Sequence, residues 1–184
     1  MVDTSLSWLG VYPLALDLTN TILANRSHPI DLLSTGADLD KWVDAVSRRH
    51  PVVRGATGHL AEVRDLRRIV RTTLYAQAEK DALPLEAISA LNWMSSQSPN
   101  YPTIGVDASR GNVDLSPDEY TAFAGAVTRS AIETAAGPTL GVCGAPSCGM
   151  LFVVGDPRQR WCSSSCGNRA RVARHADRVR VAGA

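Results

Sequence analysis

The chain has 184 residues and a nearly balanced charge, with 19 lysines and arginines against 18 aspartates and glutamates. Hydrophobic residues make up 45% of it, as in a globular protein, and the absence of a run of about eighteen apolar residues excludes a membrane-spanning helix. The charge is unevenly divided: residues 141–184 carry seven arginines and two aspartates, whereas residues 1–140 carry twelve basic and sixteen acidic residues. The sequence therefore predicts an acidic body and a basic tail with different partners.

The first part of the body is predicted to form two amphipathic helices. Leu14, Leu18 and Ile22 recur at four-residue spacing, which would place them on one face of a helix. In the next segment Trp42 lies among apolar residues at helical spacing, and Asp38 just before them is suited to cap that helix. Both helices would bury one apolar face against the rest of the body.

Three further helices and one hairpin are expected before residue 137. The expected helix starts are about Thr57, Pro84 and Ser116. The last of these opens the run Ser-Pro-Asp-Glu, which has the pattern of a capping box. Between the last two helices, residues 103–107 and 112–115 alternate around a turn and predict a small β-hairpin.

The body shows no recognisable pattern of catalytic residues, so we expect no enzyme active site there. Polar residues that interrupt its apolar helices indicate a small-molecule pocket instead, with Asn20, Arg26, Trp42 and Arg64 as candidates. Arginines on one side of the third helix, at positions 64, 67, 68 and 71, suit a solvated surface, an anionic effector site or a DNA contact. Trp42 and Trp93 also stand at core-facing positions, and burial in the core is the default expectation for both.

A domain boundary is predicted where the last helix of the body ends. Gly137 and Pro138 stop the helical pattern, which divides the chain into residues 1–137 and 138–184. The connection is short, so we expect the two domains to be docked against each other.

All four cysteines lie near the end of the chain, at positions 143, 148, 162 and 166. Two close pairs at this separation suit a tetrahedral Zn²⁺ site with Cys143, Cys148, Cys162 and Cys166 as ligands. Two disulfides would use the same residues, but the first residues lack the basic start of a secretory signal. Four thiolates would close the coordination shell, so the expected Zn²⁺ is structural rather than catalytic.

The residues around these cysteines predict a small zinc finger. Short strands near residues 140–143 and 150–154, followed by a helix that begins inside the second pair, suggest a treble-clef-like arrangement. Ser163 or Ser164 is suited to cap this helix. The fold class expected for the whole chain is therefore mainly α: a helical N-terminal domain with a small β-hairpin, followed by a treble-clef-like finger.

The last helix is expected to have two faces. Arginines and one histidine share one side, whereas Val172, Ala176 and Val179 lie on the other and are expected to pack on the hairpin around Phe152. The expected DNA contacts are Arg160, Arg171, Arg174, His175 and Arg178. Arg169 lies nearer the apolar side than the other arginines, so we expect structural roles for it and Asn168 within the finger.

The tetrapeptide Cys166-Gly167-Asn168-Arg169 and the residues around it, from Arg160 to Arg171, resemble the CGNR zinc finger, which is named for that tetrapeptide. Residues 14–21 and the segment from Asp38 to Trp42 resemble the ABATE domain that usually precedes this finger. The resemblance covers nearly the whole chain. It implies a bacterial, stress-related transcription regulator, with a DNA-binding finger and a helical domain that senses a signal.

The leading hypothesis is therefore a cytoplasmic transcription regulator that binds DNA, responds to a small-molecule effector and dimerises through its helical domain. A dimer is expected because one short finger reads few bases, whereas two fingers can read two half-sites. The alternative is a zinc-containing adaptor that binds another protein or RNA. Salt dependence separates nucleic-acid binding from protein binding, because phosphate contacts weaken steeply as salt rises.

Overall fold

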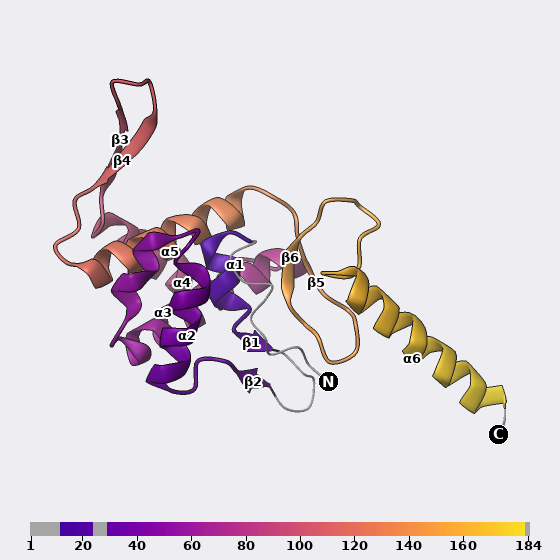
Figure 1. The fold of residues 1–184 in the computed structure, drawn as a ribbon. Helices are drawn as coiled ribbons and strands as arrows, with labels where there is room; N and C mark the ends of the chain where they lie inside the picture. The colour runs from indigo at the N-terminus through magenta and orange to yellow at the C-terminus, as the bar shows by residue number, and fades with distance from the viewer. Residues whose placement is uncertain (1–11, 24–28, 183–184) are drawn as a thin grey trace.

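The structure is a computed structural model that describes residues 12–23 and 29–182 (Figure 1). Across these described residues the fold is mainly helical with three two-stranded antiparallel sheets, which confirms the predicted fold class. In chain order the elements are α1 Leu14–Thr19, β1 Ile22–Leu23, β2 Ile30–Asp31, α2 Gly36–Val46, the 3₁₀ helix η1 Pro51–Ala56, α3 Leu60–Glu79, α4 Leu85–Ser96, β3 Asn100–Ile104, β4 Arg110–Asp114, α5 Glu119–Ala136, β5 Leu140–Val142, β6 Leu151–Val153 and α6 Ser164–Ala182.

The core of the body lies among α1, α2, α3 and α5. Trp42 of α2 and Phe123 of α5 are fully buried at its centre, with their rings edge to face and the centroids 6.3 Å apart. Gly55 of η1 lets this 3₁₀ helix approach α5 closely, because a Cβ at this position would lie 2.1 Å from the carbonyl oxygen of Glu119. Two elements project from the packed body: the β3–β4 hairpin at one end and α6 at the other (Figure 1).

The first helix is shorter than predicted. It ends at Thr19, and Ile22 lies in β1, where it pairs with Asp31 of β2. The chain turns here because the Thr21 hydroxyl donates to the carbonyl of Leu18 at 2.6 Å, which closes the last turn. The four-residue spacing of Leu14, Leu18 and Ile22 suggested a longer helix, but Ile22 belongs to a strand.

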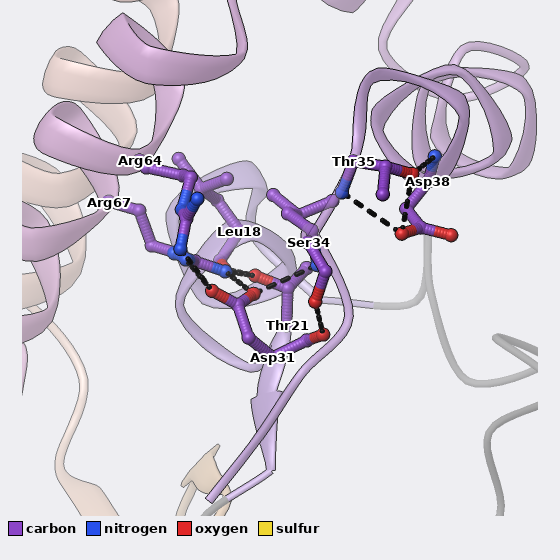
Figure 2. A network of polar contacts seen from close by, with 9 residues as sticks. Leu18, Thr21, Asp31, Ser34, Thr35, Asp38, Arg64 and Arg67 are labelled. Atoms are coloured by element: carbon purple, nitrogen blue, oxygen red, sulfur yellow. Dashed lines mark hydrogen bonds and ion pairs between the residues drawn. The ribbon is translucent and has the colours of Figure 1, made fainter.

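Two helices are capped by other residues than those predicted. Thr35, not Asp38, is the N-cap of α2: its hydroxyl accepts from the backbone N–H of Asp38, whose carboxylate accepts in return from the N–H of Thr35 (Figure 2). Asp118, not Ser116, caps α5, because its carboxylate accepts from the N–H of Thr121 at 2.8 Å. The Ser116 hydroxyl instead contacts the carboxylate of Asp114 and the hydroxyl of Ser98.

Trp93 is not in the core: 64% of its surface is exposed. The buried residues of α4 are Ala87 and Leu91. Trp93 follows Leu91 by two positions, which turns it about 200° around the helix axis, away from that buried face. The expectation that Trp93 is buried was therefore wrong, whereas Trp42 is fully buried as expected.

The two parts of the chain are docked, as the short connection predicted. Leu140 of β5 and Leu151 of β6 are buried in the same apolar cluster as the body. The side chain of Asn20 holds the backbone of Leu151 from both sides: its amide donates to the carbonyl at 3.0 Å, and its oxygen accepts from the N–H at 2.9 Å. We call this pair of bonds the Asn20 clamp. It fixes β6, and with it the finger, on the end of α1.

Candidate metal centre and nucleic-acid interface

The four cysteines gather into one cluster. All four sulfurs lie within 4.8 Å of one another, and none of the cysteines forms a disulfide. The Sγ atom of Cys148 lies 3.7 Å from that of Cys162 and 3.8 Å from that of Cys166, and the Sγ atoms of Cys162 and Cys166 are 3.5 Å apart. A tetrahedral Zn²⁺ with bonds of about 2.3 Å would hold sulfurs about 3.8 Å apart. The donor set and its spacing therefore fit Zn²⁺.

A tight turn positions the first cysteine pair. The N–H of Cys143 donates to the carbonyl of Met150 at 2.9 Å, and the N–H of Gly149 donates back to the carbonyl of Cys143 at 3.2 Å. Ser147 and Gly149 both have a positive φ, which bends the chain back on itself between β5 and β6. Residues 143–149 form this turn, which we call the knuckle.

The second pair lies at the start of α6. The hydroxyl of Ser163 accepts from the N–H of Cys166 at 3.2 Å, so Ser163 caps this helix, as one of the two predicted serines. The N–H of Cys162 donates to the sulfur of Cys143 at 3.4 Å, which draws the two pairs together.

Hydrogen bonds within the cluster shift the pKa values of three of its thiols. Hydrogen bonds from Cys148 and Cys162 lower the pKa of Cys143 far below its usual value. Donation to Cys143 raises the pKa of Cys148, and donation to Cys143 and Cys148 raises that of Cys162. Without a metal, one thiolate is therefore stabilised by protonated neighbours, whereas a divalent cation offsets the repulsion among several thiolates.

Trp161 joins the knuckle to α6. A Cβ placed on Gly167 would lie 3.0 Å from this indole ring, and one placed on Gly144 would lie 3.4 Å from it. The ring therefore fits between two glycines, one on the knuckle and one in the first turn of the helix. This close approach gives a physical reason for glycine at position 167.

Arg169 and Asn168 contact different parts of the finger. The guanidinium of Arg169 donates to the sulfur of Cys166 at 3.1 Å, so its positive charge lies beside the cluster. Four thiolates around Zn²⁺ carry a net negative charge, which a neighbouring guanidinium offsets. Asn168 is exposed, and its side-chain oxygen accepts from the guanidinium of Arg171.

Three of the predicted DNA contacts line one groove on α6. Arg171, Arg174 and Arg178, which we call the arginine stripe, surround about 540 Å³ of open space together with Asp177. The Nε of each arginine donates to the carbonyl four residues earlier at 3.3–3.4 Å, so all three side chains lie along the helix. His175 and Arg160 are exposed but do not line this groove.

The other face of α6 does not pack as predicted. Cys166 and Ala170 in its first turns are buried, whereas Val172, Val179 and Val181 are 69%, 59% and 80% exposed. The helix leaves the finger after about two turns and projects outward (Figure 1). The hairpin is too short to cover more of it, because β5 and β6 have three residues each.

Of the four predicted pocket residues, the three that the structure describes do not lie in one site. Asn20 and Trp42 are fully buried, the first in the clamp on Leu151 and the second against Phe123. Arg64 lies on α3 in a surface groove, and Arg26 lies outside the described residues. Sequence reasoning also missed Tyr75, whose hydroxyl donates to the carbonyl of Gly149 in the knuckle. Only the three-dimensional contact between α3 and the knuckle reveals that bond.

Two families match the chain, and they divide it near the end of α5. The family ABATE, described as a putative stress-induced transcription regulator, matches residues 12–138. The CGNR zinc finger matches residues 139–179. Among curated proteins no relative matches the chain. In the parts of the chain that the structure describes, no helix is long and apolar enough to cross a membrane.

Proposed function

Because the chain belongs to the ABATE family and ends in a CGNR zinc finger, we propose that it is a transcription regulator that binds DNA through α6. The observation that carries this proposal is the arginine stripe, three guanidinium groups on one side of a helix that projects from the finger. An α-helix fits the major groove of DNA, and arginine pairs with both guanine edges and phosphates.

The charge of this helix supports a polyanionic partner. Asp177 is the only acid on α6, and Arg180 pairs with it at 2.8 Å. Asp177 also borders the groove of the arginine stripe, where three positive charges exceed its one negative charge. In the proposed complex Arg171, Arg174 and Arg178 contact DNA directly. His175 and Arg160 are further predicted contacts, one on α6 and one just before the second cysteine pair.

The metal is structural in this proposal, with Cys143, Cys148, Cys162 and Cys166 as its four ligands. Their sulfurs have the spacing of a tetrahedral site, and four thiolates leave no position for a substrate. Elemental analysis of the purified protein should give about one zinc per chain. A metal-free protein with two disulfides would contradict the assignment.

The helical domain supplies regulation. We place a dimer contact and an effector site in residues 1–137, because one finger with one exposed helix reads few bases and two half-sites would raise specificity. Analytical ultracentrifugation of the zinc-loaded protein, alone and with bound DNA, tests the dimer. A single monomeric species under both conditions would exclude it.

Library selection of DNA by the zinc-loaded protein, followed by affinity measurements on the selected sequence, tests the central proposal. Substituting Arg174 with alanine should weaken binding by about 1–3 kcal/mol if it contacts a base, or weaken all sequences alike and flatten the salt dependence if it contacts a phosphate. Arg110→Ala in the β3–β4 hairpin is the matched control, because this exposed arginine lies at the opposite end of the molecule. Unchanged affinity after substitution of all three stripe arginines would exclude α6.

The exposed valines of α6 favour a second candidate function, an adaptor that binds protein or RNA. Val172 and Val179, which are seven residues apart, form an uncovered apolar side on the same helix. Protein binding through this side would depend weakly on salt, whereas binding to nucleic acid would depend on it steeply. Direct competition between DNA and RNA of the same sequence then shows which of the two nucleic acids binds more tightly.

A further inference from the structure

A cationic groove of about 600 Å³ lies along α3, beside the β1–β2 pair. Its lining includes four arginines, Arg64, Arg67, Arg68 and Arg71, together with Tyr75. Two aspartates, Asp31 and Asp65, also line it, so the groove has an excess of positive charge. We call it the arginine groove; it lies in the body and is separate from the arginine stripe on α6.

Arg67 forms the buried wall of this groove. Only 3% of its side chain is exposed, and its two terminal nitrogens donate to the two carboxylate oxygens of Asp31 at 2.6 and 2.7 Å (Figure 2). One of them also donates to the hydroxyl of Thr21 at 2.9 Å. The Nε of Arg67 is buried and has no hydrogen-bond partner among the described residues. A buried donor without a partner is costly, so this part of the groove wall is not fully satisfied by the described residues.

The other three arginines have weaker partners. Arg64 lies 3.4 Å from Asp31 with about half of its side chain exposed, and Arg68 lies 3.5 Å from the exposed Asp65. Ion pairs this exposed contribute little to stability, so their charges remain available to a ligand. Arg71 forms no ion pair within the described part of the chain; its guanidinium lies 4.2 Å above the Tyr75 ring and donates to the carbonyl of Thr19 at 3.5 Å.

We propose that the arginine groove binds a small anionic molecule through a phosphate or carboxylate group, held chiefly by Arg68 and Arg71. Guanidinium groups pair with both kinds of oxyanion in the same planar geometry. The two aspartates in the groove would repel a continuous chain of phosphates, whereas a small anion can lie between the arginines alone. This is the effector site that the proposed function requires, and its ligand class follows from the lining residues.

The groove is connected to the finger by two short paths, one to the knuckle and one to β6. Arg71 stacks on Tyr75, whose hydroxyl donates to the carbonyl of Gly149 next to Cys148. Arg71 and Arg67 also contact Thr19 and Thr21, on either side of Asn20 and its clamp on Leu151. An anion that draws Arg71 toward itself would therefore act on two of the contacts that hold the finger. This coupling rests on the proposed function, because its output is DNA affinity.

Calorimetric titration of the zinc-loaded, full-length protein tests the site without DNA. Inorganic phosphate and succinate are titrated separately at matched ionic strength, and the tighter of the two identifies the chemical group. Replacing Arg68 and Arg71 together with glutamine should weaken binding by about tenfold or more, because each would donate to a charged acceptor. Arg110→Gln, which removes an exposed arginine far from the groove, should bind like the wild type.

The outcomes separate this proposal from its alternatives. If the wild type binds neither anion, or the groove variant binds them equally well, the small-anion site is overturned. If in that case the groove variant loses DNA affinity and salt dependence, the groove contacts the DNA backbone instead. These titrations remain decisive for the site even if the protein binds no DNA at all.

The Tyr75→Phe variant tests the coupling. It keeps the ring under Arg71 but removes the hydrogen bond to Gly149, so it should bind the anion like the wild type. At fixed ionic strength the anion should shift DNA affinity in the wild type and shift it less in Tyr75→Phe. An equal shift in both proteins would exclude the path through Tyr75, and no shift in the wild type would exclude a regulatory role for the site.

Discussion

The body and the finger are stabilised in different ways, although they share one interface. The body buries large apolar side chains around Trp42 and Phe123. The finger has a second, smaller cluster in which three of the six buried residues are cysteines; its members are Cys143, Ala145, Cys148, Phe152, Cys166 and Ala170. So few apolar side chains cannot offset the entropy of ordering the finger. The body is thus predicted to fold by apolar burial, and the finger by metal binding.

Removal of zinc provides the largest test of this difference. Zinc binding supplies roughly 10–16 kcal/mol in isolated fingers, so chelation should unfold β5, β6 and α6. Hydrogen exchange should then show loss of amide protection in α6 while α3 and α5 keep theirs. Equal loss in α3 would contradict the comparison and show that the body and the finger unfold as one unit.

Breaking the Asn20 clamp tests how strongly the two regions depend on each other. Asn20→Ala would leave the buried N–H and C=O of Leu151 without these partners, at a cost of about 2–4 kcal/mol for the two groups. Urea denaturation of the zinc-loaded protein measures this loss. Asn92→Ala on α4 is the control, because that asparagine is exposed. Similar stabilities for the two variants would mean that the clamp contributes nothing.

The Arg169→Ala variant tests the finger alone. It removes the guanidinium beside Cys166 and should weaken zinc affinity about 10–100-fold, as expected when a group that contacts a metal ligand is lost. Competition with a chromophoric chelator measures the affinity. Arg171→Ala on the same helix should retain zinc normally, because its guanidinium contacts Asn168 rather than a sulfur. If Arg171→Ala also lost zinc affinity, the cause would be a change in the helix rather than loss of the charge beside the cluster.

A smaller, pH-dependent effect is expected in the body at Asp31. Burial opposes its ionisation, but hydrogen bonds from Arg67 and the N–H of Leu33, with the charges of Arg67 and Arg64, outweigh this and lower its pKa. Ionised Asp31 therefore stabilises the fold above the unfolded pKa of about 3.9, and this contribution is lost as the pH falls below that value. Denaturation from pH 6 to pH 3 should show a steeper loss in the wild type than in Asp31→Asn. Parallel curves would exclude a role for this carboxylate.

The finger was the more predictable of the two regions. The spacing of the cysteines specified the cluster, and Ser163 was one of two serines expected to cap the following helix. Zinc ligation constrains the chain locally, so short-range sequence patterns are informative there. The position of α6 was not predictable, because Val172 and Val179 have the spacing of a buried face but no partner surface to cover them.

In the body, helix spacing predicted the number of helices better than their ends or contacts. The spacing of Leu14, Leu18 and Ile22 gave no sign that the chain would turn at Asn20. Asn20 looked like a pocket residue because a polar side chain among leucines has no partner in the sequence alone. Its partner, the backbone of Leu151, is 131 positions away, and only tertiary packing brings the two together.

A metal bound to the four cysteines would also act as a nucleus for the last helix. Starting an α-helix is unfavourable by a factor of about a thousand, because several residues must be fixed before the first hydrogen bond forms. In α6 that start is held by Cys166, the Ser163 cap and the Trp161 ring against Gly167. The outer turns, with exposed valines and no cover, only extend what the cluster begins. The alignment of Arg174 and Arg178 would therefore depend on a metal ion that neither of them contacts.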